Sequence, residues 1–415
     1  MPDQSTSKCS AQPTISETAQ ITSEIIWDSS AITAFLPEWQ ALADRILPGS
    51  FFLRPAVWQS WQRRLCGSKP AGLMVVYHQS TLIGVMPVMI RNAWRGPTLG
   101  VRYDYDPQDR RWLSKPARRI IPMRQMSPVL SLPATMLGPV LLAADSDKPA
   151  VISAMARTIS NTRGWDMAVF PLEQEELALW QSEFDQVGLL THEQILDRPG
   201  VNLRNLAPLD QVIARASAKG RQNYRRATAA AVKAGILFSI NRDAPATMAI
   251  LRDLANQSWK AKGRTGQHTV IPFDGLQGEF FDDLILGADK SQVVCAIATQ
   301  DGTPIAIVMG VVTGRTLTTL LTYWNGCEPS ASPGALTMGT IIDWAAKNRI
   351  DQVDFNSNAP WLKPFADHRE IQQNLLVFAS GPSGRALATF RRAGLGLKSG
   401  LEKIMNRNPI KAASK

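Results

Sequence analysis

The chain of 415 residues has few cysteines and histidines, and it has no long apolar run without proline. Its four cysteines include no Cys-x-x-Cys pair, and its four histidines lie far apart. Zinc sites and disulfide frameworks need closely grouped residues, so we expect reduced cysteines and no bound metal. The closest candidate for a spanning helix, residues 127–144, is uncharged but holds three prolines, which would break the helix.

The first 20 residues lack the apolar core of a secretory signal peptide. They are rich in Ser, Thr and Gln, which is typical of disorder. These properties predict a cytoplasmic protein. The composition, 45% apolar and 19% charged residues, excludes a wholly disordered or collagen-like chain. The length predicts more than one domain.

Positive charge is in excess, and the excess is unevenly distributed. The chain has 45 basic and 35 acidic residues, a net charge of +10. Residues 1–200 hold 19 of each sign, whereas residues 201–415 hold 26 basic and 16 acidic residues. Two windows account for the excess: residues 204–233 hold seven basic and one acidic residue, and residues 381–415 hold eight and one. Such concentrated charge predicts an anionic partner, which is a membrane surface, a phosphorylated cofactor or acidic carrier protein, or nucleic acid.

The two basic windows differ in pattern. The first falls in an Ala-rich stretch that predicts a helix over residues 209–234, and it is either a binding surface or a solvated helix face. The second predicts a basic amphipathic helix, which can lie on an anionic membrane or pack on its own domain. We expect packing for the part before Gly394. Its apolar positions recur every three or four residues: Leu387, Phe390, Gly394, Leu397, Leu401 and Ile404.

Elsewhere, helical and strand patterns alternate. Residues 72–90 and 293–312 each predict an antiparallel hairpin, the second with a turn at Asp301-Gly302. The second strands of the two hairpins read alike, and the sequence Gln-Ser-Trp occurs at residues 59–61 and 257–259. The repetition predicts two copies of one α/β unit that meet near residue 205, with chance similarity of apolar strands as the alternative.

The helix predicted over residues 333–347 has an uncommon start. Ser332 is a favoured N-cap, and Pro333 is favoured at the first helical position. Gly334 and Ala335 are small, and no Asp or Glu occupies the first turn. The N-terminus of a helix attracts anions, so this turn predicts a pyrophosphate site. The alternative is an ordinary capped helix.

Several short motifs follow one another in a characteristic order. They are Leu251-x-x-Leu254-x-x-x-Ser258-Trp259-Lys260, the turn and strand Asp301-Gly302-Thr-Pro-Ile-Ala306, Ser332-Pro333-Gly334, Val353-Asp354-Phe355 with Lys363, and Ser50-Phe51-Phe52 near the start. Over about residues 25–395 the chain resembles the GNAT acyltransferases, in particular the bacterial CelD/BcsL-type acetyltransferase-like proteins, with tandem FemAB-like transferases as wider relatives. Two elements depart from that pattern. Trp361-Leu362-Lys363 replaces a Tyr-Lys element, and Asn356-Ser357-Asn358 replaces a Gly-rich one.

The resemblance implies an α/β (α+β) fold of tandem acyl-CoA N-acyltransferase (GNAT-like) domains, with mixed central sheets flanked by helices. It divides the chain into four parts. These are a disordered N-terminus (1–20), a degenerate domain on the acceptor side (21–204), a domain that binds the acyl donor (205–380), and the basic amphipathic helix and tail (381–415).

The resemblance also implies a site. Residues 316–323 and 353–355 would form strands that separate and free N–H groups for the thioester. The donor would be acyl-CoA or an acyl carrier protein thioester, with no metal. The implied bases are Asp354 and Glu328, with Tyr323 as proton donor. The donor-binding residues are Ser332, Pro333, Gly334, Ala335, Leu336, Asn356 and Lys363, and the acceptor-binding residues are Trp259, Lys260, His268 and Trp361. For each side chain the alternative is a structural or surface role.

These expectations combine into a function. We predict an acyltransferase that moves an acyl group to an amine or hydroxyl of an envelope lipid, a polysaccharide or a precursor. It would work in the cytoplasm or peripherally on the inner face of the cytoplasmic membrane. FemAB-like aminoacyl transfer is the alternative enzyme activity. The non-enzymatic alternative is nucleic-acid binding through residues 215–233, although no helix-turn-helix or zinc motif flanks that helix.

Overall fold

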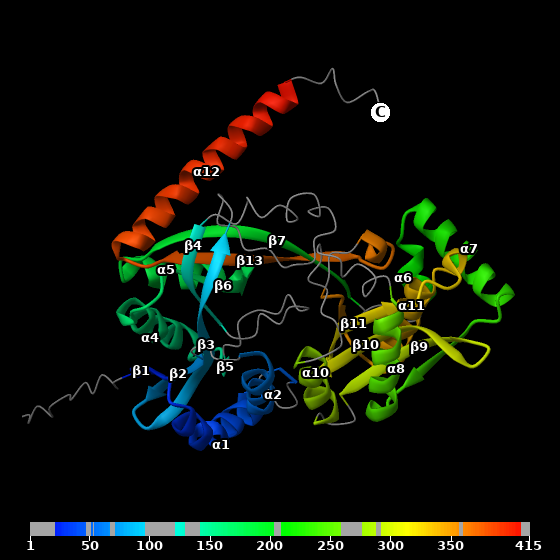
Figure 1. The fold of residues 1–415 in the computed structure, drawn as a ribbon, viewed down its shortest axis with the longest axis horizontal. Helices are drawn as coiled ribbons and strands as arrows, with labels where there is room; N and C mark the ends of the chain where they lie inside the picture. Colours follow the sequence, from blue (N-terminus) through cyan, green and yellow to red (C-terminus); the bar gives the residue numbers. More distant parts are fainter. Residues whose placement is uncertain are drawn as a thin grey trace, which may run out of the picture.

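The computed structural model describes residues 21–46, 51–52, 54–66, 71–95, 121–128, 142–202, 209–258, 276–287, 292–356 and 360–407. Helices cover both faces of a mixed sheet (Figure 1), which confirms the predicted fold class. None of the helices in these segments combines the length and hydropathy that crossing a bilayer requires.

The first half of the chain runs from a short edge strand to a long one. The edge strand, residues 21–26, was not predicted. The elements are β1 (Ile21–Ile26), α1 (Ser29–Ile46), α2 (Pro55–Trp61), the π-helical turn η1 (Gln62–Cys66), β2 (Ala71–His78), β3 (Thr81–Arg95), β4 (Ile121–Pro128), β5 (Leu142–Ala143), α4 (Lys148–Asn161), β6 (Met167–Glu173), α5 (Gln174–Gln186) and β7 (Leu190–Asn202).

The second half begins with two helices and ends with the longest helix. Its elements are α6 (Leu209–Ala214), α7 (Ala218–Lys233), β8 (Leu237–Asn241), α8 (Ala244–Gln257), α10 (Leu276–Leu286), β9 (Val293–Gln300), β10 (Thr303–Thr313), β11 (Thr316–Trp324), the 3-10 turn η4 (Pro329–Ala331), α11 (Pro333–Lys347), β12 (Gln352–Asp354), the 3-10 turn η5 (Pro360–Leu362), β13 (His368–Phe378) and α12 (Pro382–Arg407).

The two halves repeat one order of elements. Each has a strand, helices, an antiparallel hairpin, a third strand, a helix, and a strand parallel to the third. The parallel pairs are β4 with β6 and β11 with β12. The two strands with similar sequences are β3 and β10, and each is the second strand of the hairpin in its half. The two Gln-Ser-Trp sequences do not occupy equivalent places, because the first ends α2, the second helix after β1, whereas Gln257 ends α8, the first helix after β8.

One continuous sheet joins the two halves. Its strand order in the described part of the chain is β1-β2-β3-β4-β6-β13-β7-β12-β11-β10-β9-β8, with β5 paired to β3. Strand β13 follows the second half in sequence but lies antiparallel between β6 and β7 of the first half. Strand β7 in turn pairs with β12. Figure 1 shows these two long strands, β7 and β13, running across the molecule from one lobe to the other.

A shared apolar core also connects the halves. One cluster of buried side chains contains Trp39 and Trp58 from the first half and Phe281 and Leu321 from the second. Separate clusters lie under α4 and α5 and under α11. Because apolar burial is the main stabilising contribution to folding, we expect the two halves to unfold together.

The helix predicted over residues 209–234 is two helices. Chain direction changes at Ser217, whose hydroxyl caps α7 by accepting from the backbone N–H of Gly220 at 3.1 Å. Serine is a favoured N-cap, so a sequence signal for this break was present. At the other end Gly235 has a φ of +66°, which fits its predicted role as a helix terminator.

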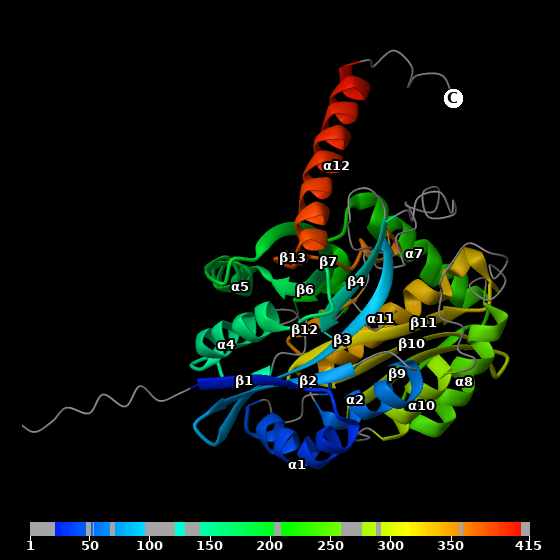
Figure 2. The same ribbon diagram turned by 60° about the vertical axis from the view of Figure 1, so that its left-hand side comes forward.

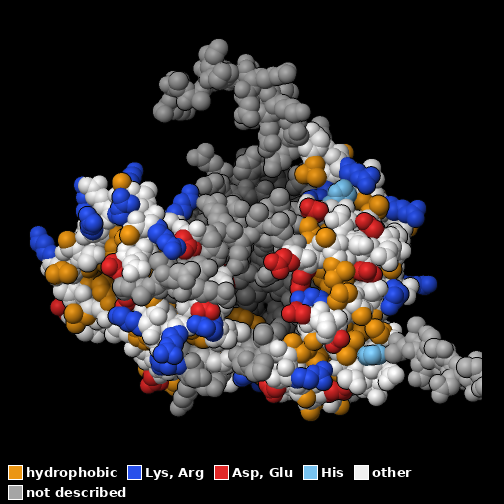
Figure 3. Space-filling model, turned by 180° about the vertical axis from the view of Figure 1, so that it is seen from behind, with side chains coloured by type: hydrophobic (Ala, Val, Ile, Leu, Met, Phe, Trp, Pro, Cys, Tyr) orange, Lys and Arg blue, Asp and Glu red, His pale blue; other side chains and the backbone are white. Residues whose placement is uncertain are grey.

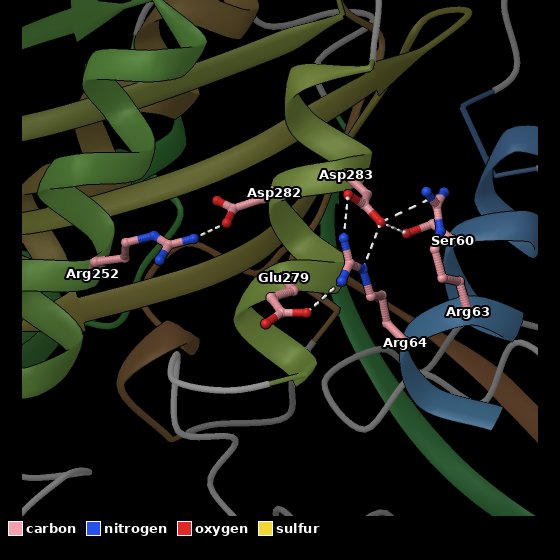
Figure 4. Close-up of polar contacts among 7 residues, drawn as sticks. All are labelled: Ser60, Arg63, Arg64, Arg252, Glu279, Asp282 and Asp283. Atoms are coloured by element: carbon pink, nitrogen blue, oxygen red, sulfur yellow. Dashed lines mark hydrogen bonds and ion pairs between the residues drawn. The ribbon is translucent and has the colours of Figure 1, made fainter. Parts of the chain in front are cut away.

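A polar cluster reinforces the contact between the halves (Figure 4). Arg64 of η1 donates to Asp283 of α10 at 3.0 Å and to Glu279 at 2.5 Å. Ser60 donates to the same Asp283 oxygen at 3.1 Å, and an Arg63 nitrogen lies 3.7 Å from it. The hydrogen bond from Arg64 is the main cause that holds the pKa of Asp283 below its ordinary value.

Asp283→Ala should lower the free energy of unfolding by about 1 kcal/mol, because the carboxylate is only partly screened by solvent. Its native pKa is depressed, so this contribution is present above the ordinary carboxyl pKa and is lost as the pH falls through the lower native value. Denaturant titrations at neutral and acidic pH measure both effects. Asp343→Ala, which removes a pair with Lys347 inside α11, is the control and should cost less. An equal loss in both variants would contradict the interface role.

Candidate active site

Strands β11 and β12 are paired over a short distance only. Residues 316–318 pair in parallel with residues 352–354. The other edge of β11 pairs with β10 as far as Trp324. From Thr318 to Trp324, about 20 Å at 3.3 Å per residue, no described strand lies against the edge that faced β12. This is the separation of strands that the family resemblance implies.

A β-bulge lies in β11 just beyond Thr318, the last residue of this strand that pairs with β12. Met309 of β10 faces Leu321, but the next residue, Gly310, faces Thr319, so that Leu320 is the extra residue. A Cβ atom on Gly310 would lie 3.0 Å from a backbone carbonyl oxygen of β11, so a larger residue does not fit there. A bulge takes a residue out of the regular ladder and is common beside active sites. The sequence analysis missed it, although an isolated glycine in a strand is a signal for one.

The loop after β11 has a fixed and strained shape. Glu328 and Ser332, on either side of η4, have φ values of 50° and 44°, a region that non-glycine residues rarely adopt. The indole N–H of Trp324 donates to the carbonyl of Cys327 at 2.7 Å. The Asn325 side chain accepts from the Cys327 N–H at 3.0 Å. These contacts position the start of α11 relative to the end of β11.

Helix α11 starts at Pro333, as predicted, but Ser332 is not a side-chain cap. Its backbone is left-handed, and its side chain accepts no hydrogen bond from the first turn. The carbonyl of Ser332 accepts from the N–H groups of Ala335 and Leu336 instead. A Cβ atom on Gly334 would meet nothing within 4 Å. The first turn therefore borders open space, has no acidic residue, and lacks the expected cap.

Asp354, at the end of β12, is not the solvated strand-end residue that was one alternative. It is 4% exposed, and its Oδ1 accepts from the N–H of Asn356 at 2.8 Å. Asn356 is also buried and has a φ of 48°. Beside them the Thr319 hydroxyl donates to the carbonyl of Phe355 at 2.9 Å. The carboxylate thus lies next to the bulge, at the point where β11 and β12 part.

The two other proposed proton-transfer residues are placed differently. Tyr323 is 4% exposed and belongs to the apolar cluster that contains α8, on the sheet face opposite α11. Burial raises the pKa of its hydroxyl, so that this group keeps its proton. Glu328 is half-buried at the start of η4, close to the first turn of α11. Glu328 therefore lies closer to the start of α11, where a phosphate site was predicted, than to Asp354 at the other end of the free β11 edge.

The remaining predicted residues fall into two groups. Trp361 and Lys363 are exposed in the η5 region, where the neighbouring Pro364 lies 3.8 Å from the Cβ position of Gly220 at the start of α7. The first turn of α11 packs near the other end of α7, so the structure does not place Lys363 beside it. Trp259, Lys260 and His268 lie outside the described residues. The roles of all of these stay predictions.

The equivalent helix of the first half lacks these features. Helix α4 also follows a hairpin and a third strand, but Asp145 and Asp147 precede it, and Lys148 at its start pairs with Glu176 at 2.9 Å. Carboxylates and an ion pair at that helix start leave no vacant anion site. The contrast between the two helices supports a donor site in the second half alone.

Comparison with known proteins agrees with this asymmetry. The model of the acetyltransferase (GNAT) domain matches residues 218–361, from the first residue of α7 to the middle of η5. This range contains β11, β12 and the start of α11. No curated protein matches the sequence.

Similar solved structures extend over both halves of the chain. The C-terminal domain of a putative lysylphosphatidylglycerol synthetase from Agrobacterium fabrum is 13% identical with a TM-score of 0.49, and the match covers 88% of this chain and 96% of that one. FemX is 10% identical with a TM-score of 0.49, covering 83% and 95%. A tandem GNAT protein from the clavulanic acid biosynthesis pathway is 11% identical with a TM-score of 0.46, covering 87% and 99%. Residues 218–361 therefore form an acetyltransferase (GNAT) domain, and this domain makes the protein an acyltransferase.

Proposed function

We propose that the second half binds a pantetheine thioester along the free edge of β11. The phosphates lie at the first turn of α11, and the thioester lies at the bulge beside Asp354. The observation that carries the proposal is the edge itself. It leads over about 20 Å from Thr318, beside the bulge, to the loop before an acid-free helix start. Backbone N–H groups on such an edge can hold an extended amide chain and a developing oxyanion.

The transfer itself needs positioned groups and no metal. An amine or hydroxyl of the acceptor attacks the thioester carbonyl, a new C–N or C–O bond forms, and the C–S bond breaks. Asp354 takes the proton from the nucleophile. Glu328, the second predicted base, lies near the end where we place the phosphates, and its role stays a prediction. The coenzyme leaves as a thiolate. Tyr323 as its proton donor stays a prediction, because this side chain lies in the apolar cluster on the opposite face of the sheet.

We place the acceptor between the two lobes. In Figure 3 acidic side chains lie on the side of the right-hand lobe that faces the middle of the molecule. The acceptor is an amine or hydroxyl of an envelope lipid, a polysaccharide or a precursor. Mass spectrometry of lipids and polysaccharide from a strain that lacks the protein tests this class. We expect an acylated species to disappear and its unacylated precursor to accumulate. Identical profiles in both strains would exclude these acceptors.

Helix α12 supports a location at the membrane surface. Its first part packs on the first half. Ser383 donates to Asp166 at 2.8 Å, Ala388 is buried, and Arg391 donates to the carbonyl of Glu193 at 3.0 Å. Beyond that point the helix runs free of the body (Figures 1 and 2). A projecting basic helix can lie on anionic lipid.

Removal of residues 395–415 should release the protein from vesicles rich in phosphatidylglycerol by at least about tenfold in partition coefficient. The deletion keeps the part of α12 that packs on the first half, and it removes five basic residues and one acidic residue. Each basic residue near an anionic surface contributes about 1 kcal/mol to the free energy of membrane binding. Vesicle sedimentation measures the loss. The variant Arg157→Glu/Arg163→Glu, with the same change in net charge at exposed positions near the end of α4, should still sediment. Unaltered sedimentation of the truncated chain would leave α12 without a membrane role.

A further inference from the structure

Helix α7 has a basic surface that takes no part in the donor site proposed above. The helix contains no acidic residue. Arg221 turns back and donates to the carbonyl of Ala216 at 2.5 Å. The other basic side chains are exposed, and no described residue pairs with them: Lys219, Arg225, Arg226 and Lys233. Like charges on one helix repel one another, and a bound anionic partner would offset this repulsion.

This surface adjoins the presumed donor site. Ala227 and Ala231 of α7 belong to the same buried cluster as Ala331 of η4 and Leu336 of α11. The two helices also approach closely further along, where a Cβ atom on Gly339 would lie 2.5 Å from the Tyr224 hydroxyl. The exposed side of α7 is therefore the outer wall beside the turn that we assign to the phosphates.

The extent and composition of the surface indicate the kind of partner. Lys219 and Lys233 are 14 residues apart, or about 21 Å along the helix. The phosphates of one coenzyme molecule do not need basic side chains over such a length of helix. Two aliphatic side chains at its end are largely exposed, Val232 at 75% and Leu237 at 71%. Phosphate backbones are contacted by charged and polar groups, so exposed aliphatic side chains favour a protein partner over a nucleic acid. In Figure 3 Lys and Arg side chains gather at the upper left, over this lobe.

We infer that α7 docks an acidic acyl carrier protein that delivers the thioester to the β11 edge. The inference rests on the proposed function and adds the source of the acyl group. Charge complementarity orients the carrier, the aliphatic pair packs against it, and its phosphopantetheine arm reaches past the start of α11. Acyl-CoA enters the same donor site without using the α7 surface.

The variant Arg225→Glu/Arg226→Glu tests the inference in the full chain. Both side chains are exposed and lack partners, and glutamate is a good helix former, so the fold should persist. The probes are acetyl-CoA and a bacterial acyl carrier protein that bears the same acetyl group, with dissociation constants measured by calorimetry. We expect affinity for the carrier to fall at least about 30-fold and affinity for acetyl-CoA to change less than about threefold. Arg157→Glu/Arg163→Glu is the charge-matched control and should bind both probes normally.

The other outcomes overturn the inference in different ways. An equal loss for both probes would mean that the arginines serve the nucleotide of CoA. Loss of carrier binding in the control variant would mean non-specific attraction, and unchanged binding of both probes would mean no role. Selective loss of tRNA binding, with no carrier binding in the wild type, would make nucleic acid the partner. If wild-type protein binds the carrier but not acetyl-CoA, the inference stands and the phosphate site fails. If it binds acetyl-CoA but not the carrier, only the inference fails.

Discussion

Gly334→Glu is expected to weaken acetyl-CoA binding at least about 100-fold, which corresponds to about 2.7 kcal/mol. The glutamate would place a carboxylate at the helix start where we place the diphosphate. Two like charges about 4 Å apart near a protein surface repel by up to about 4 kcal/mol. Calorimetric titration of the purified chain measures the loss.

The position allows a clean control for this variant. A Cβ atom on Gly334 meets no neighbouring atom within 4 Å, so the side chain fits the folded protein. An acidic residue in the first turn stabilises a helix by about 0.3–1 kcal/mol, so the variant should unfold no more readily than the wild type. Gly334→Gln has nearly the same bulk without the charge and should bind acetyl-CoA more tightly than the glutamate variant. Unchanged affinity in Gly334→Glu would remove the phosphates from this turn.

Asp354→Asn is expected to lower turnover about 100-fold or more if the carboxylate is the base. The change is conservative for structure, because an amide oxygen can still accept the hydrogen bond that Asn356 donates at 2.8 Å. Turnover is measured as release of CoA in the presence of the acceptor that the lipid and polysaccharide profiles identify. Binding of acetyl-CoA should change little, because Asp354 lies at the thioester end of the edge.

Asp301→Asn is the matched control for this substitution. Asp301 is exposed in the hairpin turn with a φ of 48°, a conformation that asparagine tolerates well. Its turnover should equal that of the wild type. If Asp354→Asn also retains the wild-type rate, Asp354 only holds the turn at Asn356, and Glu328→Gln becomes the next variant to measure.

Features with strong local signals were predictable from the sequence. The Asp301-Gly302 turn has φ values of 48° and 75°, as a tight hairpin requires. Helix α11 has the predicted bounds, residues 333–347, because Pro333 starts it and apolar periodicity continues it. The family resemblance then gave the pair of separating strands beside it, residues 316–323 and 353–355. In each case the signal lies within a few residues of the feature.

Features that depend on distant contacts were not predictable. Strand β13 pairs with β6 and β7, about 200 residues away along the chain, and nothing in its own residues specifies those partners. Ser332 has the residue type of an N-cap, but the strained loop from Glu328 imposes a left-handed backbone that prevents capping. A solvated strand-end position was the alternative for Asp354, and the packing of the strands beside it makes it buried. Tertiary context overrode local preference at these points.

A crystal structure of the protein with acetyl-CoA tests the central claim most directly. We predict a diphosphate oxygen about 3 Å from the backbone N–H of Gly334, the pantetheine arm along residues 320–324, and the thioester beside Asp354. Density for the diphosphate at any other place, with the first turn of α11 vacant, would contradict the account.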